Sequence, residues 1–266
     1  MCVLDSIKDD RLIHLAIHLG FVCSLREGEV AGIDVKTINL KEGSLWISRQ
    51  VQRVSDDSIR ELPKEELIEV FPKKVAGSKS SLILKSPKTA GSHRKQYLTV
   101  PLIHEIAERL QDIQRCKDFF REEYHDHGLL ICQPDGTPLD PCYLVRGFRK
   151  CQLEMGIPES ERIDFQGLRK SGQMHKVRLS QNNYQLVAEN AGQSPEVLMT
   201  HYNEVLDCEK RALSRLVEDS FYPQREKTEE TPDSADVSAL MTQIQQSPEL
   251  YQKLLQVLTP GAQQHA

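Results

Sequence analysis

Apolar residues recur at every third or fourth position along much of this chain, and that spacing predicts amphipathic helices. It is clearest between residues 10 and 25, where the apolar positions fall on one side of a helix. A shorter helix is expected over residues 26–33. Pro101 should open a helix that runs to about Tyr124, and Asp140 should cap the next one. The remaining expected helices cover residues 165–180, 183–191 and 195–220.

Short runs rich in β-branched and alternating residues lie between these helices and predict strands. The runs are at residues 37–40, 44–48, 81–85, 96–100 and 128–132. Gly43 supplies a turn between the first two runs, so they should form a β-hairpin. The third and fourth should form a second hairpin, and the polar stretch 54–80 is interpreted as an insertion between strands. Together these patterns predict an α+β fold that is mainly α, with one small antiparallel β-sheet.

The last part of the chain differs in composition from the rest. Residues 223–236 are charged and rich in Pro and Thr, which is typical of a flexible linker. Apolar residues then recur with helical spacing over 237–258. We therefore expect a body over residues 1–222, the linker, and short amphipathic helices that dock on the body or on a partner, since they bury little alone.

The charge balance argues against a uniformly basic surface. The formal net charge is −5, and residues 223–266 account for −3 of it, with three basic and six acidic side chains. Proteins that bind nucleic acids usually carry a basic surface, so any such contact would depend on local clusters. Three groups of basic residues stand out: Lys73, Lys74 and Lys79; Lys85, Lys88, Arg94 and Lys95; and Arg146, Arg149 and Lys150.

The seven cysteines are scattered and form no CxxC pair, which indicates reduced thiols rather than a disulfide framework. No run approaches 18 apolar residues, so no transmembrane helix is expected. The N-terminus lacks the basic and small-residue features of a signal peptide. These observations predict a cytoplasmic protein.

Two arginines carry the first part of the candidate chemistry. Arg26 precedes Glu29 by three positions on the predicted short helix, so the carboxylate can orient the guanidinium. Arg169 follows Gln166 with the same spacing on another helix. Arginine is permanently charged and binds phosphate oxygens in a bidentate way, so the pair suits a phosphate group.

A tyrosine and a lysine complete the set. Gln193 lies in a Gly-Gln-Ser turn, and Tyr202 follows it by nine residues. A tyrosine hydroxyl can act as a covalent nucleophile once its proton is removed or its anion is stabilised. Lys88 lies at the tip of the second predicted hairpin, from which it could reach into a cleft. The combination suits chemistry at a phosphodiester.

In order and spacing these residues resemble the catalytic domain of tyrosine recombinases, the phage-integrase family. The resemblance covers residues 10–215. Residues 24–33 resemble the first arginine box of the family, residues 87–102 its lysine hairpin, and residues 167–169 its second arginine box. The step from the turn glutamine to the tyrosine has the family's nine-residue length.

The resemblance implies site-specific recombination or integration of DNA for a mobile element, through a 3′-phosphotyrosyl intermediate. Tyr202 would attack the DNA phosphate, Lys88 would protonate the leaving 5′ oxygen, and Arg26 and Arg169 would stabilise the transition-state charge. Glu29 would support the first arginine. No cofactor or metal is implied. The implied partner is double-stranded DNA at attachment sites, bound by a homo-oligomer that is a tetramer on DNA, with no membrane partner.

The chain departs from the family pattern at two catalytic positions. Gln166 stands where the family commonly has histidine, and Gln193 where it has histidine or tryptophan. Glutamine donates hydrogen bonds but does not exchange a proton near neutral pH. Loss of a general base typically costs about 10²–10⁴-fold in rate, so slowed or specialised catalysis is expected.

Two further expectations concern DNA binding. Lys85, Arg94 and Lys95, near the predicted lysine hairpin, are expected to contact DNA. Arg26 comes too early in the chain to leave room for the N-terminal DNA-binding domains that family members usually carry. We therefore expect either a catalytic fragment or a truncated protein.

Two alternative functions remain open at this point. A catalytically impaired DNA-binding remnant with a regulatory role would bind DNA without forming a covalent bond. A helical protein-interaction module would use its tail and would not bind DNA, and the acidic balance of the chain favours this alternative over a DNA-binding one.

Overall fold

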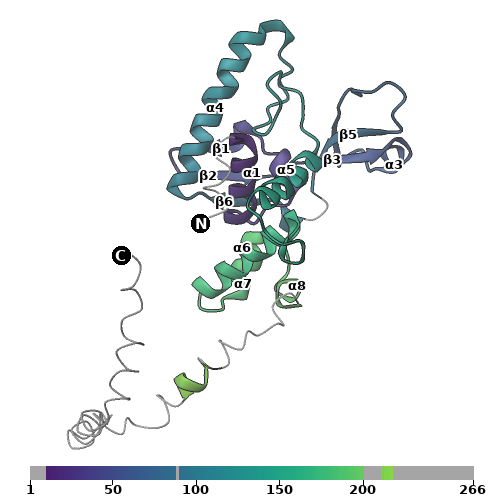
Figure 1. Cartoon of the computed structure of the whole chain (residues 1–266). Helices are drawn as coiled ribbons and strands as arrows, with labels where there is room; N and C mark the ends of the chain where they lie inside the picture. Colours follow the sequence, from purple (N-terminus) through teal and green to yellow (C-terminus); the bar gives the residue numbers. More distant parts are fainter. Residues whose placement is uncertain (1–9, 88–89, 201–210, 212, 218–266) are drawn as a thin grey trace, which may run out of the picture. The chain divides into compact units, whose positions relative to one another are not determined.

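Most of the helices predicted from apolar spacing are present in the computed structural model, which describes residues 10–87, 90–200, 211 and 213–217 (Figure 1). The chain divides into two compact units, residues 1–204 and 205–266. In the second unit, residues 211 and 213–217 are helical. The predicted linker and tail helices, and with them the predicted boundary after residue 222, lie outside the described residues.

Apart from α3, which was not predicted, the helices of the first unit begin close to the predicted positions. They are α1 (Arg11–Val22), α2 (Glu27–Ala31), α3 (Asp56–Glu61), α4 (Val100–Phe120), α5 (Pro141–Glu154), α6 (Phe165–Leu179), α7 (Tyr184–Ala191) and α8 (Pro195–Thr200). Side-chain caps fix several of their starts. Asp10 accepts from Ile13 N at 3.1 Å, and Asp140 accepts from Cys142 N at 2.9 Å. Beyond Thr200, the rest of the helix predicted to run to residue 220 cannot be followed continuously, because residues 201–210 lie outside the described ones.

The strands form two antiparallel sheets rather than the one that was expected. The strands are β1 (Ile38–Asn39), β2 (Ser44–Ile47), β3 (Gln50–Ser55), β4 (Leu67–Val70), β5 (Ser80–Lys85) and β6 (Arg94–Tyr97). One sheet has the order β1-β2-β6 and the other the order β3-β5-β4. The fold class, mainly α with small antiparallel sheets, is confirmed.

Three strand predictions need correction. The hairpin of residues 81–85 with 96–100 is wrong, because β5 pairs with β3 and β4 whereas β6 pairs with β2. The stretch 54–80 is more than a polar insertion, since it forms the helix α3 and the strand β4, and β4 belongs to the second sheet. Residues 128–132 form only isolated bridges, from Leu129 to Asp34 and from Cys132 to Pro138.

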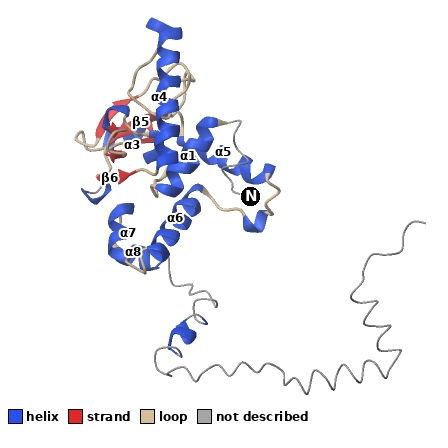
Figure 2. Cartoon of the chain, turned by 90° about the vertical axis from the view of Figure 1, so that its left-hand side faces the viewer, coloured by secondary structure: helices blue, strands red, loops and turns tan. Residues whose placement is uncertain are grey.

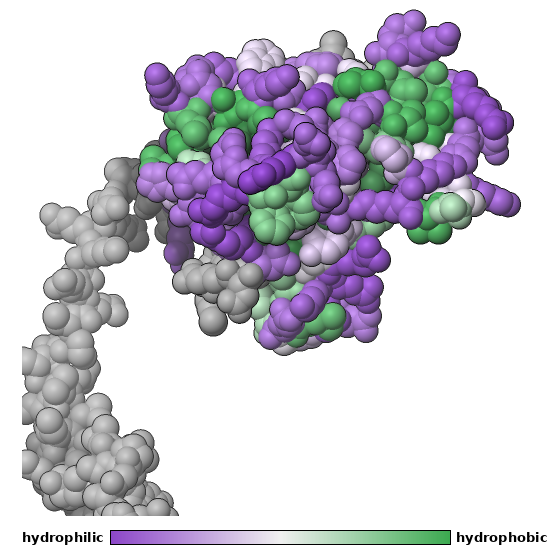
Figure 3. Space-filling view, turned by 90° about the horizontal axis from the view of Figure 1, so that it is seen from above, coloured by the Kyte–Doolittle hydropathy of each residue, from purple (hydrophilic) through white to green (hydrophobic). Residues whose placement is uncertain are grey.

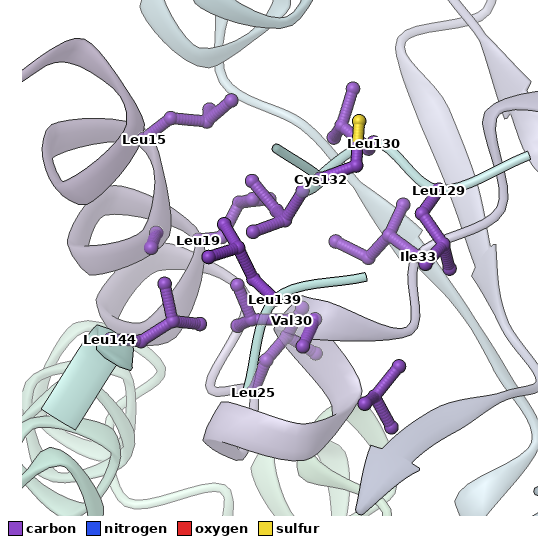
Figure 4. Packing of buried hydrophobic residues seen from close by; sticks show 14 of the residues in the cluster. Leu15, Leu19, Leu25, Val30, Ile33, Leu129, Leu130, Cys132, Leu139 and Leu144 are labelled. Atoms are coloured by element: carbon purple, nitrogen blue, oxygen red, sulfur yellow. The ribbon is translucent and has the colours of Figure 1, made fainter. Parts of the chain in front are cut away.

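The main core surrounds α1, which contacts α2, α4, α5 and α6 (Figure 1). Figure 4 shows Leu19 of α1 near Val30 of α2, with Leu15 of α1 and Leu144 of α5 in the same cluster. All four are buried, and burial of each such side chain contributes roughly 1.5–3 kcal/mol. This core holds α2, the helix of the first arginine box, against α1 and α5.

A second, smaller cluster holds the three helices after α5 together. It consists of Val177, Val187, Ala188 and Leu198, which come from α6, α7 and α8. Figure 2 shows these helices grouped side by side. The cluster therefore fixes the turn between α7 and α8, which contains Gln193.

The surface is dominated by polar side chains. In Figure 3, hydrophilic side chains cover most of the face seen from above, and apolar ones are confined to separate patches. Within the described parts of the chain, no helix is long and apolar enough to cross a membrane.

Candidate active site

A buried carboxylate, that of Glu29 on α2, lies at the centre of the candidate active site. Only 1% of this residue is exposed. Its Oε1 accepts from Arg26 Nη1 at 2.9 Å, and its Oε2 accepts from Arg94 Nη2 at 2.8 Å. Arg169 Nη1 lies 3.5 Å from the same Oε2. Three guanidiniums from distant parts of the sequence therefore meet at one carboxylate.

The guanidiniums keep Glu29 ionised. Burial opposes ionisation, but the charge and hydrogen bonds of Arg94, with the charges of Arg169 and Arg26, hold the pKa of Glu29 below its ordinary value. Arg26 N also donates to Oε2 at 3.1 Å. Because three positive charges share one negative charge, the cluster has a surplus of positive charge that favours an anionic ligand.

Arg169 is the most deeply buried of the three arginines, with 1% of the residue exposed. Its Nη1 donates to Ser24 O at 2.5 Å, and its Nη2 donates to Ala191 O at 2.8 Å and to Gln193 Oε1 at 3.4 Å. Burial, reinforced by the Arg26 charge and opposed by Glu29, lowers the pKa of Arg169. The guanidinium nevertheless stays charged at neutral pH.

A lysine that the sequence analysis did not single out, Lys176, joins this cluster from α6. Its Nζ donates to Ser24 Oγ at 3.1 Å and to Asn190 Oδ1 at 2.6 Å. Burial, with the charges of Arg94 and Arg169, lowers the pKa of Lys176 to about 8. The ammonium is therefore still mostly protonated at neutral pH.

Asn190, the residue before the end of α7, links this cluster to β6. Its carbonyl accepts from Arg94 Nε at 3.1 Å and from Gln96 Nε2 at 2.5 Å. Its Nδ2 donates to Gln96 Oε1 at 3.1 Å. The polar face of β6 thus holds the end of α7 next to the arginines.

A cavity of about 800 Å³ opens beside this cluster. Arg26, Glu29 and Gln193 line it, together with Gln185 and Glu189 of α7. The Arg26 side chain is 39% exposed, whereas Arg169 lies behind Glu29 and does not line the cavity. Across the described residues, no group of three or more His, Cys, Asp or Glu side chains is arranged to hold a metal ion.

Comparison with known proteins gives a match at the level of structure only. No family model matches the sequence, and no curated protein matches it. An integrase of the transposon Tn1549, solved in complex with a circular intermediate DNA, superposes with a TM-score of 0.56 at 14% identity, covering 80% of this chain. The XerA recombinase gives 0.54 at 11% identity over 84% of this chain. The XerH site-specific recombinase bound to palindromic difH substrate gives a TM-score of 0.51 at 18% identity over 81% of this chain.

The chain has the fold of a tyrosine recombinase catalytic domain. It spans 62% of the length of the Tn1549 integrase and XerA chains and 50% of the XerH chain.

Within this tyrosine recombinase fold, the structure brings together four of the predicted site residues: Arg26, Glu29, Arg169 and Gln193. Two other predicted residues, Lys88 and Tyr202, lie outside the described residues. The neighbours of Lys88 at Pro87 and Gly91 line the cavity, and α8 ends at Thr200.

Gln166 is placed differently from Gln193. It lies in the first turn of α6, three residues before Arg169, and is exposed without lining the cavity. Gln193 lies between Arg169 and Gln173, and its Nε2 donates to Gln173 Oε1 at 3.3 Å. Of the two glutamines, therefore, only Gln193 lines the cavity.

The three residues expected to contact DNA also differ in placement. Lys85 is 2% exposed, and its Nζ donates to Glu66 Oε2 at 3.1 Å. Arg94 is 6% exposed and is bound to Glu29. Only Lys95, which pairs with Glu42, lies on the outer face of its strand. Lys85 and Arg94 thus form internal ion pairs, Lys85 with Glu66 and Arg94 with Glu29, because their strands direct these side chains inward.

The tyrosine recombinase resemblance did not reveal Lys176, Asn190 or the internal position of Arg94. A signal for Arg94 was present in the sequence, because β6 alternates and places Arg94 and Gln96 on one face and Lys95 and Tyr97 on the other. Lys176 and Asn190 gave no such signal, since each is an ordinary polar residue on a helix.

Proposed function

We propose that this protein breaks and rejoins double-stranded DNA through a covalent bond to Tyr202. The observation that carries the proposal is the meeting of Arg26 and Arg169 at Glu29, beside a cavity lined by Gln193, within a tyrosine recombinase fold. The similar Tn1549 integrase structure is a complex with DNA, and the similar XerH recombinase structure is a complex with its difH substrate. The surplus of positive charge at Glu29 supports an anionic substrate.

In the proposed reaction, the Tyr202 hydroxyl oxygen bonds to the phosphorus while the bond from phosphorus to the 5′ oxygen breaks. Lys88 gives a proton to the leaving 5′ oxygen, and the phenol proton passes to solvent, since glutamine accepts none. Arg26 contacts the phosphate from the cavity wall, and Arg169 stabilises the growing charge from behind it. The reverse reaction rejoins the strands, with the chain assembled as a homo-oligomer on the DNA.

Trapping the covalent intermediate tests this proposal directly. A library of nicked suicide duplexes of random sequence, labelled at the 5′ end of the cleaved strand, should yield a labelled adduct on a denaturing gel. Tyr202→Phe should abolish the adduct, because it lacks the nucleophile. Tyr143→Phe, a change at an exposed tyrosine of α5, is the matched control and should leave the yield unchanged.

The gel also has outcomes that count against the proposal. An adduct that persists in Tyr202→Phe would show that another residue is the nucleophile. An Arg26→Met variant that forms adduct as fast as the parent would remove the arginine from the proposed mechanism, because loss of one transition-state contact should cost about 10²-fold or more.

One observation favours a second candidate, a DNA-binding protein that does not cleave. Gln166 stands where the resemblance places histidine and Gln193 where it places histidine or tryptophan, while Arg169 donates hydrogen bonds to Ser24, Ala191 and Gln193. This candidate predicts binding that weakens steeply with salt, because phosphate contacts release counterions. It also predicts no adduct in the assay above.

A further inference from the structure

Two cations of α6 connect the same two segments of the chain. Arg169 joins Ser24 O to Ala191 O, at 2.5 and 2.8 Å. Lys176 joins Ser24 Oγ to Asn190 Oδ1, at 3.1 and 2.6 Å. The two side chains are seven residues apart and therefore point the same way, two helical turns from each other. We call this arrangement the double bridge.

The first of the bridged segments leads directly to Arg26. Ser24 is fully buried, and its φ of 52° lies in the left-handed region that residues with a Cβ rarely adopt. Such a conformation persists only where its surroundings hold it. Arg169 holds the carbonyl of Ser24 and Lys176 holds its hydroxyl, so the backbone entering the arginine box is fixed from both sides.

The second bridged segment leads directly to Gln193. Asn190 also accepts from Arg94 and Gln96 through its carbonyl, and its Nδ2 donates to Gln96. Its Oδ1 is therefore the atom left for Lys176, and the asparagine cannot turn away without losing contacts. Loss of the ammonium would leave Oδ1 without this donor next to the turn that holds Gln193.

We propose that Lys176 is a positioning residue for strand cleavage. The inference rests on the proposed function, since it concerns the same site. Lys176 does not line the cavity. It acts through Ser24 and Asn190 and fixes the distance between Arg26 and the α7–α8 turn. Arg169 alone would hold Ser24 through its carbonyl only, whereas the double bridge also ties the Ser24 hydroxyl to Asn190, whose other polar atoms are held by Arg94 and Gln96.

The test compares three variants of the full chain on the duplex that the parent cleaves. Lys176→Met removes both hydrogen bonds at similar length, Lys176→Arg keeps the charge and donors, and Lys170→Met changes an exposed lysine of the same helix. A small misplacement of catalytic groups costs up to about 10²-fold in rate. We expect the single-turnover rate of adduct formation to fall about 10- to 100-fold in Lys176→Met, to recover in part in Lys176→Arg, and to stay unchanged in Lys170→Met.

Two further measurements separate positioning from a general loss of structure. The Kd for the duplex should stay within about twofold of the parent, because Lys176 contacts no ligand. Hydrogen exchange at residues 190–193 should become about tenfold faster in Lys176→Met only, since local opening would no longer be opposed by the bridge. Exchange across α1 should not change.

The possible outcomes are distinct. Unchanged cleavage in Lys176→Met overturns the proposal, as does unchanged exchange at residues 190–193. A parallel fall of rate, affinity and α1 protection overturns it too, because that pattern means general destabilisation. If the parent protein forms no adduct, the proposed function is wrong, and the proposed role of Lys176 in strand cleavage is wrong with it. The hydrogen-exchange data then still show whether Lys176 holds residues 190–193 in place.

Discussion

Three guanidiniums pair with the carboxylate of Glu29, so substitution of this residue should disturb the site more than substitution of any one arginine. Glu29→Gln keeps the size of the side chain and removes its charge. Because this leaves buried cations without their partner, we expect the free energy of unfolding at pH 7 to fall by about 3–5 kcal/mol in urea denaturation. Glu27→Gln, two residues away on α2, is the matched control and should cost less than about 1 kcal/mol. Equal losses in both variants would contradict the central role of Glu29.

The parent protein and the Glu29→Gln variant should also differ in how their free energies of unfolding depend on pH. The folded-state pKa of Glu29 is lowered, so its carboxylate contributes stability above its unfolded pKa, and this contribution is lost as the pH falls. The unfolded value is about 4.3. The stability gap between parent and Glu29→Gln should therefore be constant above about pH 5 and narrow at lower pH. A gap that stays constant on acidification would mean that the pKa is not lowered.

Residue-level prediction succeeded where chemistry is local. Arg26 and Glu29 are three positions apart, and the ion pair between them follows from helix geometry. It did not foresee that Lys85 and Arg94, which were predicted to contact DNA, are buried. Their partners, Glu66 and Glu29, are 19 and 65 positions away. Contacts at such separation depend on the tertiary fold, which spacing along the chain does not define.

At the scale of elements, the turn between α7 and α8 needs a glycine for two separate reasons. Gly192 has a φ of +66°, which ends α7 in the left-handed region, and a Cβ there would lie 2.8 Å from Arg94 Nη1 and 3.0 Å from Gly91 O. The conformation alone disfavours other residues by about 1–2 kcal/mol. The close approach adds to that cost and would move Arg94 away from Glu29.

A matched substitution separates these two effects. Gly156 has a φ of +70°, but a Cβ added there would meet nothing within 4 Å, so Gly156→Ala should cost only the conformational part, about 1 kcal/mol. Gly192→Ala should cost about 1–3 kcal/mol more in urea denaturation, because the added atom overpacks the site. Equal costs would show that the turn accommodates a methyl group and that Arg94 does not depend on it.

Helices could be predicted from the sequence, and so could the hairpin of β1 with β2, which a short turn at Gly43 joins. The partners of β5 and β6, which are distant in sequence, could not. A spacing of three and four defines the buried side of α1 without reference to any other element. The apolar run of β5 and the alternation of β6 indicate strands but not their partners, since a strand can pair with any neighbour of matching register. For this reason residues 54–80 were interpreted as an insertion, although β4, which lies within them, pairs with β5.

At the scale of the whole molecule, a net charge of −5 means that DNA contact would depend on individual exposed cations. Lys95, which is paired with Glu42, is 28% exposed and accessible to DNA, whereas Lys85 is only 2% exposed. Each phosphate contact contributes about −0.9 to the slope of log K against log salt concentration. Lys95→Met should reduce the magnitude of that slope by about 0.9, measured by fluorescence anisotropy with labelled duplex, whereas Lys85→Met should leave it unchanged. The reverse result would mean that DNA contacts β5 rather than the outer face of β6.

The engagement of Arg169 with Ser24, Ala191 and Gln193 has a consequence for which molecules this protein would process. A small anion that enters the cavity meets Arg26, whereas Arg169 does not line the cavity and donates to Ser24, Ala191 and Gln193. Bringing that guanidinium onto a phosphate requires an exchange of partners, and the free energy for the exchange must come from contacts elsewhere on the ligand. A long duplex supplies such contacts and a mononucleotide does not. Under the proposed function, the protein would therefore not react with free nucleotides and would react only with polymeric DNA.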